Sequence, residues 1–537
     1  MGRRRAGSAV TVAGRSDDDV AVTAADVPAP ARAARLAGYG PSLAVIGPFI
    51  LLGLRCALWR SHVFLRGDLA LIDLSVRNAG RLHQVLGPYD RFGWHHPGPV
   101  YFYLVASVAR VVGGGLQAQA VGAALLNGLS VGGVVFVVGR LAGRRAAVGA
   151  GALLAAAVAV LGPVVMINPW NPYVVVLPVL LVGVLSVGAA CGVTTCWAAA
   201  ALVGTFVVQT DVGTLPVVAA ALVLSGASWL IWKPQRTALT KAPAAVVLLV
   251  LAVALWVPPL VQQLTGSPGN LGQIVSFMTA GHPRAGLPAA VRALGSAQLN
   301  VVGLSSGGAV GLLLPVALGS TGVVWGTRRR SLFAAAAGAL CLLSVVVSIA
   351  AAAAVVGPVY RYLIEWSVAL PLLGAVGVIT AAGTDQPAGE SSSRAGRPMT
   401  AVPWVALAVG VLALVGRMLS LPSFGTYSAP EVAAAWDLVR PALAVRPHER
   451  VEVDAVDPAG WAVAAGLCDE IDRTATGFVV PSQWGFQYGS DRVGSAATVV
   501  YLRAPAPPPG EPGQLLGRAG PVSVWLAHQA GGPTGVS

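Results

Sequence analysis

The feature that most constrains this chain is a series of apolar stretches, each close to the length that a helix needs to cross a lipid bilayer. Of its 537 residues, 55% are hydrophobic and 11% are charged, whereas a soluble domain carries roughly 25% charged residues. The Ala, Leu and Val runs do not alternate as barrel strands do, so the crossings are predicted to be α-helices. Twelve candidate spans follow along the chain: 43–59, 97–113, 117–139, 146–166, 173–190, 195–209, 213–232, 244–262, 305–326, 331–355, 359–381 and 401–420.

The basic character of the chain indicates membrane topology and not nucleic-acid binding. The formal net charge is +13, and Arg clusters at 3–5, 144–145 and 328–330 flank apolar spans, as the excess of positive charge on cytoplasmic loops requires. The five cysteines contain no C-x-x-C pair, so neither a metal site nor a disulfide framework is predicted. Residues 1–40 hold few bulky apolar groups and are predicted to be a disordered cytoplasmic N-terminus.

The positions of the basic clusters predict that two polar regions share one face of the membrane. The basic N-terminus places the loop 60–96 outside, and the basic flanks of the later spans place residues 421–537 outside as well. Twelve crossings cannot satisfy both placements, so one candidate does not cross, and we expect it within 97–140. The chain is therefore predicted to have eleven to thirteen crossings in a plasma-membrane domain over 41–420, with both polar regions extracytoplasmic.

The polar region 421–537 is predicted to form a small α/β domain. Residues 451–456 alternate between apolar and polar side chains as a half-buried strand does, and residues 460–472 have the spacing of an amphipathic helix. The alternating aromatic residues of Trp484–Tyr488 would share one face of an extended segment, either in the core or as a surface on which a sugar stacks. Further strands are predicted at 478–481, 498–503 and 522–527.

The loop 60–96 concentrates charged and aromatic groups beside the membrane. A helix with one apolar face is predicted from Asp68 onward, and Asp73, Arg77 and Arg81 follow at four-residue steps, which predicts a solvated ionic face. Such a helix beside a span is expected to lie in the plane of the membrane interface. The loop ends at His95-His96-Pro97, where the next span is expected to begin.

Polar and ionisable side chains interrupt three later spans, and each interruption has a structural and a functional interpretation. Arg361 and Glu365 are either an i,i+4 pair that satisfies itself or part of a site. Asp211, which follows Gln209 closely, is either a helix cap or a ligand. The Asn168–Asn171 segment breaks two spans and is interpreted first as a turn.

In the order of its first features the chain resembles the C-type (GT-C) membrane glycosyltransferases, which include protein mannosyltransferases, lipid A aminoarabinose transferases and actinobacterial arabinosyltransferases. The likeness rests on Arg66-Gly67-Asp68 after the first span and on His95-His96-Pro97-Gly98-Pro99, with the basic segment 140–145 as a weaker third feature. The resemblance implies that a sugar comes from a polyprenyl-phosphate donor and that a first-loop carboxylate, here Asp68, is the general base. Many members have an Asp-Glu pair where this chain has Asp68-Leu69, which is a departure from the family pattern.

Asp68 is therefore either the catalytic base or the N-cap of the helix that follows it, and the two roles are compatible. The leaving phosphate of such a reaction also needs cations. Arg66, Arg91, the two histidines and Arg361 are the cationic candidates, although His95 and His96 have the alternative role of anchoring the loop at the lipid headgroups. The predicted substrate-binding residues are Arg66, Arg91, Trp94, His95, His96, Gln209, Asp211, Tyr360, Arg361 and Glu365.

The resulting hypothesis is a membrane glycosyltransferase that moves a sugar from a polyprenyl-phosphate donor to a cell-envelope glycan or lipid at the outer membrane face. The Gly- and Ala-rich composition is typical of a high-GC actinobacterial source, which favours an acceptor of that kind. A divalent cation is left open as a cofactor, and no metal ligands are assigned. The alternatives are a polytopic transporter or flippase and a non-catalytic scaffold for envelope assembly. A cavity around Asp68 would favour transfer, and a site at the membrane midplane would favour transport.

Overall fold

The computed structural model describes residues 39–59, 61–231, 242–304, 306–383, 401–445, 448–455, 458–474, 476–503 and 513–528. The predictions for residues 1–38 and for the basic segment 233–241 lie outside these ranges. From Pro41 onward the chain forms one unit.

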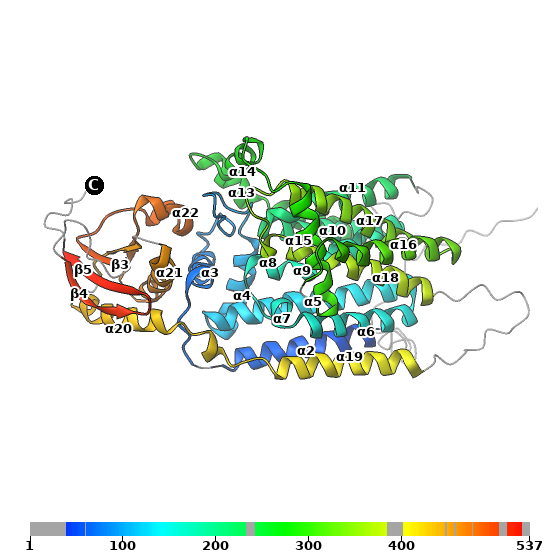
Figure 1. Cartoon of the computed structure of the whole chain (residues 1–537), viewed down its shortest axis with the longest axis horizontal. Helices are drawn as coiled ribbons and strands as arrows, with labels where there is room; N and C mark the ends of the chain where they lie inside the picture. The colour runs from blue at the N-terminus through cyan, green and yellow to red at the C-terminus, as the bar shows by residue number, and fades with distance from the viewer. Residues whose placement is uncertain are drawn as a thin grey trace, which may run out of the picture. The chain divides into compact units, whose positions relative to one another are not determined.

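Apolar helices make up most of the described chain, and many of them run side by side as a bundle (Figure 1). Ten helical stretches of the described residues are long and apolar enough to cross a membrane. They confirm that the predicted spans are helical. A helix of Ala, Leu and Val satisfies its own backbone N–H and C=O groups, as a crossing in lipid requires. The ten are α2 (Gly40–Ala57), α5 (Leu116–Ala142), α6 (Arg144–Leu161), α8 and α9 (Asn171–Val174, Val176–Ala190), η1 and α11 (Val212–Thr214, Leu215–Ile231), α12 and α13 (Pro243–Ala254, Val257–Thr265), η5 and α16 (Gly308–Leu312, Leu313–Arg328), α17 (Leu332–Ala353), η7 and α18 (Glu365–Val368, Ala369–Gly383) and α19 (Ala401–Leu419).

Two shorter apolar helices, α4 (Val100–Val112) and α10 (Thr194–Thr210), complete the set in the described residues. Helix α10 joins the end of α9 to the start of α11, and its first residue, Thr194, accepts a hydrogen bond from Trp229 near the far end of α11 at 3.1 Å. It therefore crosses antiparallel to α11. With α10 added to the ten longer stretches, the described residues contain eleven candidate crossings.

Helix α4 does not cross, which corrects the predicted span at 97–113. Tyr103 in its first turn donates to the carbonyl of Gln84 in the first loop at 2.9 Å, and Gly115, just after its end, donates its backbone N–H to Asp73 at 2.9 Å. Both ends of α4 thus lie against the loop. The physical reason is length, because a helix of 13 residues rises only about 20 Å, short of the ~30 Å hydrocarbon core.

The ends of α2 and α19 meet at the face that carries both polar regions. Arg55, near the end of α2, donates to the carbonyl of Met418 at 2.6 Å and to that of Leu421 at 2.8 Å, at the end of α19. The loop 60–96 follows α2 and the C-terminal region follows α19, so both begin at one face. That arrangement requires an odd number of crossings, which eleven satisfies.

The segments that join the spans contain short helices of their own. The break at Asn168 separates α7 (Pro163–Met166) from α8, and the Asn168 side chain accepts from the backbone N–H of Trp170 at 3.0 Å, which confirms the predicted turn. Helices that sequence analysis left unassigned lie between α13 and α16: α14 (Asn270–Thr279), α15 (Leu287–Gln298) and η4 (Leu299–Val302). Between α17 and η7 lies η6 (Arg361–Leu363).

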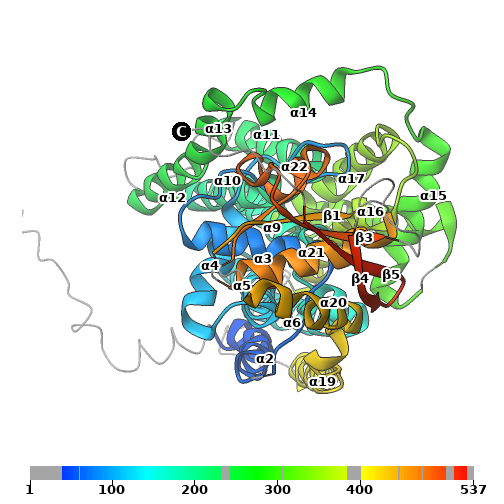
Figure 2. The ribbon, with the colours of Figure 1, turned by 90° about the vertical axis from the view of Figure 1, so that its left-hand side faces the viewer.

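The C-terminal region forms an α/β domain with a five-stranded sheet in the order β2-β1-β3-β5-β4 (Figure 2). Strand β1 pairs parallel with β2 and β3, β5 is antiparallel to β3 and β4, and α21 packs against β1 and β3. The predicted strands and helix are present, and β4 is an additional strand. The elements are η8 (Phe424–Tyr427), α20 (Pro430–Ala444), β1 (Val451–Ala455), α21 (Pro458–Asp472), β2 (Phe478–Val479), η9 (Ser482–Trp484), α22 (Gly485–Tyr488), η10 (Ser490–Arg492), β3 (Thr498–Arg503), β4 (Gly513–Ala519) and β5 (Val522–His528).

The aromatic segment Trp484–Tyr488 is helical and not extended, which corrects the prediction of a shared face. The rings turn to different partners: Phe486 packs edge-on against Tyr89 of the first loop with centroids 6.0 Å apart, and Tyr488 packs against Phe478 of β2 at 5.8 Å. Helical turns rotate successive side chains by about 100°, so alternate residues do not line up as they do in a strand.

Candidate active site

The loop helix α3 (Gly67–Gly80) places Asp68 in its first turn. The helix begins one residue earlier than predicted, its N-cap is Arg66, and no side chain caps that end. Gly67 has a φ of +53°, and a Cβ there would lie 3.3 Å from the ring of Trp461, so a glycine suits this position. The interpretation of Asp68 as the N-cap is therefore wrong, and its carboxylate is available for another role.

The carboxylate of Asp68 accepts a hydrogen bond of 2.6 Å from the hydroxyl of Tyr89. Burial raises the pKa of Asp68 above its ordinary value, and the hydrogen bond from Tyr89 lowers it in part. Burial, together with the charges of Asp68 and Tyr362, raises the pKa of the Tyr89 hydroxyl, which stays protonated and donates. Asp68 is thus a fixed carboxylate with increased proton affinity, as a general base needs to be.

Asp68 lines a cavity of about 520 Å³ between α3 and the C-terminal domain. One face of α3 forms a wall, since Asp68, Ile72, Ser75 and Asn78 follow at helical steps of three or four residues. The other walls are the loop residues 83–89 with His95, the pair Trp170 and Asn171, and the segment Gln487–Arg492 of the C-terminal domain. The cavity therefore exists only because the first loop and the C-terminal domain meet.

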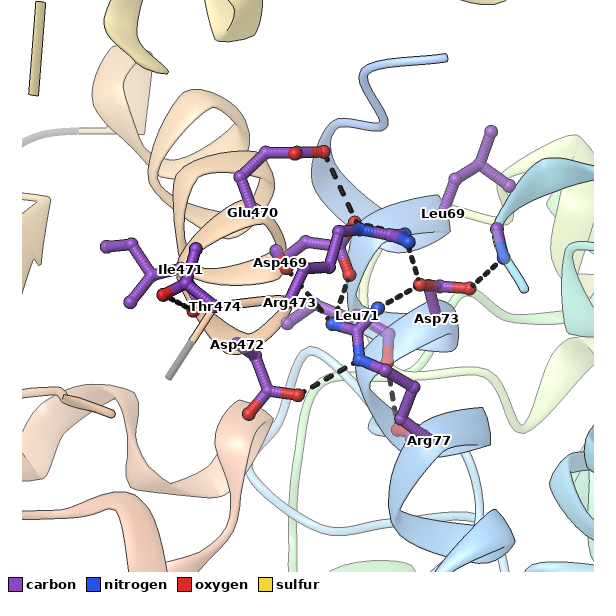
Figure 3. Close-up of polar contacts among 12 residues, drawn as sticks. Leu69, Leu71, Asp73, Arg77, Asp469, Glu470, Ile471, Asp472, Arg473 and Thr474 are labelled. Atoms are coloured by element: carbon purple, nitrogen blue, oxygen red, sulfur yellow. Dashed lines mark hydrogen bonds and ion pairs between the residues drawn. The ribbon is translucent and has the colours of Figure 1, made fainter. Parts of the chain in front are cut away.

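The opposite face of α3 is buried in a cluster of ion pairs with α21, which corrects the predicted solvated face (Figure 3). The side chain of Asp73 is 1% exposed. It accepts from Arg77, from Arg473 at 2.5 Å and from the backbone N–H of Gly115 at 2.9 Å. Arg77 in turn pairs with Asp469 at 2.6 Å. We call this set, together with Asp472, the ionic clamp.

Asp472 connects the ionic clamp to the cavity. Its carboxylate accepts from Arg77 at 2.9 Å and from Arg492 at 2.7 Å, and it lies 3.8 Å from Arg81. Arg81 and Arg492 both line the cavity. Burial alone would lower the pKa of Arg77, but the charges of Asp469 and Asp73 outweigh it and raise that pKa, so Arg77 is a permanent cation.

The two histidines lie in the loop as neutral side chains. The Nδ1 atom of His95 is 3.0 Å from the carbonyl of Gly87, and burial lowers the pKa of this imidazole. His96 accepts the backbone N–H of Val212 on Nδ1 at 3.0 Å, and burial, with a smaller effect of His95, lowers its pKa to about 3. Neutral imidazoles supply no positive charge for a phosphate. Both imidazoles instead contact backbone groups of the protein, and His95 also lines the cavity.

A second group of predicted residues lies around Trp170. Arg91 stacks over the ring of Tyr360 at 5.0 Å and donates to the hydroxyl of Tyr362 at 3.4 Å, and Tyr362 packs against Trp170 with centroids 5.0 Å apart. We call Arg91, Tyr360 and Tyr362 the arginine–tyrosine patch. Since Trp170 also lines the cavity, the patch adjoins the cavity across this one indole ring.

The remaining predicted residues have structural partners. Arg361 pairs with Glu365 at 2.8 Å, and Asp211 caps η1 by accepting from Gly213 at 2.9 Å, so both structural interpretations are confirmed. Burial raises the pKa of Asp211 to about 7. The other positions are as follows: Arg66 pairs with Glu431 at 2.5 Å, Gln209 donates to the carbonyl of Leu255 at 2.8 Å, and Trp94 packs 5.7 Å from the ring of His96.

Several residues that line the cavity or hydrogen-bond to Asp68 were not predicted from the sequence. Tyr89 was part of the loop, but no periodicity connects it to Asp68. Arg81 was assigned to a solvated face, and Arg492 lies far from the loop in sequence. In the described part of the chain, no group of three or more His, Cys, Asp or Glu side chains is placed to hold a metal ion.

Comparison with known proteins gives a likeness in structure alone. No family model matches the chain, and no curated protein matches its sequence. The structure of ArnT from Cupriavidus metallidurans bound to undecaprenyl phosphate is 16% identical, covers 90% of this chain and 98% of its own, and has a TM-score of 0.53. The apo structure of the same protein is 15% identical, covers 89% and 97%, and has the same TM-score of 0.53.

An oligosaccharyltransferase from Archaeoglobus fulgidus in the apo form is also similar, with 12% identity, coverage of 87% of this chain and 69% of its own, and a TM-score of 0.40. The likeness to ArnT over nearly the full length of both chains shows that this protein has a GT-C-like membrane fold. The resemblance expected from the first-loop motif is confirmed at the level of the fold.

Proposed function

We propose that this protein is a membrane glycosyltransferase that transfers a sugar from a polyprenyl-phosphate donor to an acceptor hydroxyl in the cavity beside Asp68. The observation that carries the proposal is the half-buried carboxylate of Asp68, held by Tyr89 on the wall of a 520 Å³ cavity. The similarity in fold to ArnT, whose structure holds undecaprenyl phosphate, supports a donor of this lipid class.

The chemical step needs one base and one anion-binding group. Asp68 takes the proton of the acceptor hydroxyl, and the acceptor oxygen forms a bond to the anomeric carbon of the sugar. The bond between that carbon and the donor phosphate oxygen breaks, and the polyprenyl phosphate leaves with the electron pair. Tyr89 holds the Asp68 carboxylate in place throughout, because its hydrogen bond orients one carboxylate oxygen and leaves the other for the acceptor.

The arginine–tyrosine patch is the candidate for the donor phosphate. Among the described residues, two of the three predicted arginines, Arg66 and Arg361, form ion pairs with carboxylates. Arg91 instead donates to the hydroxyl of Tyr362 and to a backbone carbonyl. It lies two residues from Tyr89, which holds Asp68. A phosphate at Arg91 would therefore lie near the base, as the direct bond between phosphate and transferred sugar demands.

The charges of the described spans favour transfer over transport. Within these helices the Arg, Lys, Asp and Glu residues lie in the first or last turns, as Arg55, Arg140, Arg328 and Glu365 do, and the central turns carry none. A transporter concentrates ionisable groups at the midplane. Here the ionisable groups converge at one face instead, around Asp68.

We further propose that this face is extracytoplasmic, in a plasma membrane, and that the acceptor is a cell-envelope glycan or lipid. The basic residues at the opposite ends of the spans support this orientation, since Arg140, Arg144 and Arg328 lie at helix ends remote from the loop. With such an orientation the C-terminal domain faces the envelope, where acceptors of this class are found.

The experiment that tests the function uses the purified full chain in lipid nanodiscs with a radiolabelled polyprenyl-phosphate sugar and envelope glycan fragments. The expected result is labelled glycan together with one released polyprenyl phosphate per transferred sugar. Asp68→Asn should reduce turnover by roughly 10²–10⁴-fold with donor binding little changed. Asp437→Asn, a change to an exposed carboxylate on α20, is the matched control. Movement of the intact donor across a vesicle membrane without release would instead support a flippase.

A further inference from the structure

The cavity is lined along α3 from Asp68 to Asn78 and by Arg81, which follows the end of that helix. Asp68 and Arg81 are thirteen positions apart, which corresponds to about 20 Å along the helix axis at 1.5 Å per residue. Between them, Ser75 and Asn78 present a hydroxyl and an amide to the same cavity. The cavity is thus an elongated groove with a carboxylate at one end and a guanidinium at the other.

The end remote from Asp68 carries a second guanidinium from the C-terminal domain. Arg492 of η10 lines the cavity and donates to Asp472 at 2.7 Å, and the same carboxylate lies 3.8 Å from Arg81. Asp472 is only 5% exposed, and it also accepts from Arg77 at 2.9 Å. A buried carboxylate therefore fixes two arginines from different parts of the chain at one place on the groove wall.

The charged groups at this end differ in how tightly they are paired. The ionic clamp and the neighbouring Arg492 pair three carboxylates (Asp73, Asp469 and Asp472) with three arginines (Arg77, Arg473 and Arg492). Glu470 lies 3.0 Å from His62 and 3.7 Å from Arg473, and the exposed Asp491 lies 3.9 Å from Arg492. Arg81 is the additional cation. Its side chain is 50% exposed, and its contact with Asp472, at 3.8 Å, is longer than a hydrogen bond. The Arg81 guanidinium therefore keeps donors that a ligand in the groove can bind.

We infer that Arg81 and Arg492, positioned by Asp472, form an anion subsite, and that the acceptor is a saccharide that carries a phosphate or a carboxylate at this end. The inference rests on the proposed function. The donor phosphate is bonded to the carbon that reacts, so it must lie at the Asp68 end. An anion held at the Arg81 end therefore belongs to the acceptor. Guanidinium groups bind phosphate and carboxylate oxygens in matching planar geometry.

The test measures binding of defined oligosaccharides to the full chain in nanodiscs by isothermal titration calorimetry. The probes are maltotriose, the same trisaccharide with a terminal phosphate, and a trisaccharide of the same length with a terminal uronic acid. The anionic probes should bind roughly tenfold more tightly than maltotriose, as charge-assisted hydrogen bonds predict. Arg81→Gln should remove this preference, and Arg81→Lys should keep part of it. Arg518→Gln, a change to an exposed arginine of β4, should leave it unchanged.

The role of Asp472 is tested by the same preference. Asp472→Asn should reduce the preference for the anionic probes while binding of maltotriose stays the same, and Asp472→Glu should restore part of it. A merely structural role of Asp472 would weaken all three probes equally. If Asp472→Asn weakened binding of all three probes equally while Arg81→Gln left the anion preference unchanged, the positioning role of Asp472 would be overturned.

Three further outcomes decide the source of the anion and separate this inference from the proposed function. Equal binding of neutral and anionic probes by the natural chain would overturn the subsite. Weakened binding of undecaprenyl phosphate by Arg81→Gln, to the same extent as the anionic trisaccharide, would show that the subsite serves the donor and would also overturn the inference. A persistent anion preference in a chain that transfers no sugar would support the subsite and contradict the proposed function.

Discussion

Removal of the charge of Asp73 should loosen the attachment of the C-terminal domain to α3. Asp73→Asn keeps the shape of the side chain and keeps an oxygen that can accept the backbone N–H of Gly115. It loses the negative charge that faces Arg77 and Arg473, and an amide N–H in place of the second oxygen would point its hydrogens at two guanidinium groups. The change therefore breaks a buried ion pair from one side only.

The expected magnitude follows from the burial of the pair. The Asp73 side chain is 1% exposed, whereas Arg77 and Arg473 are 19% and 26% exposed and both keep Asp469 as a partner. Breaking a buried pair by removing one partner costs about 3–5 kcal/mol. Because Arg77 and Arg473 keep Asp469 as a partner, we expect the lower end of this range. If the pair were exposed, as the periodicity of the sequence predicts, breaking it would cost well under ~1 kcal/mol. The two interpretations thus differ by several kcal/mol.

The assay is native-state hydrogen exchange of the full chain in nanodiscs, read for amides of α3 and α21. A local loss of about 3 kcal/mol should speed their exchange by roughly two orders of magnitude. Asp437→Asn should leave these amides unchanged, since this carboxylate is exposed on α20. The double variant Asp73→Asn with Arg473→Gln should lose less stability than the sum of the two single changes, because it removes one negative and one positive charge together.

An exchange rate in Asp73→Asn within threefold of the natural chain would refute this reasoning. The side chain would then be solvated, and the ionic clamp would not hold the domain. Loss of sugar transfer without faster exchange would refute it in another way, because Asp73 would then act directly in the chemistry.

Three other predictions follow from the site and the topology. The rate of sugar transfer should rise as the pH passes through the raised pKa of Asp68, because the base acts only when it is ionised. The Asp68→Ser variant should lack this rise. If initial rates showed the same pH profile for the variant and the natural chain, Asp68 would be excluded as the base. The pKa of His96 is lowered to about 3 in the folded protein, so its contribution to the free energy of unfolding is complete above the ordinary pKa of 6.5 and is lost as the pH falls toward 3. The His96→Gln variant can still accept the N–H of Val212, and its thermal stability should fall less on acidification. Cysteines placed at Ser61 and Ser490 should both react with an impermeant reagent on whole cells, and reaction at only one would contradict a shared outer face.

The sequence alone determined the class of the fold and pointed to the loop that holds the candidate site. Long apolar runs cannot remain in water or satisfy their backbone in lipid except as helices, so the spans followed from hydropathy. The strands β1, β3 and β5 followed from alternation over a few residues. The loop after the first span stood out because charged residues are scarce elsewhere in the chain, and Asp68 lay within it. These features depend on residues close together in the chain.

Only the tertiary structure decided which charges are buried and which apolar segment crosses. Asp73 and Arg77 have the spacing of a solvated helix face, and their burial depends on Asp469 and Arg473, which lie nearly 400 positions away. Segment 97–113 is apolar enough to cross, but it lies along the loop because α4 is too short and its ends are held there. The cavity also needs a wall from Gln487–Arg492. The periodicity of a helix reports the polarity of its faces, but whether water or another part of the chain covers a polar face is a property of the packed molecule.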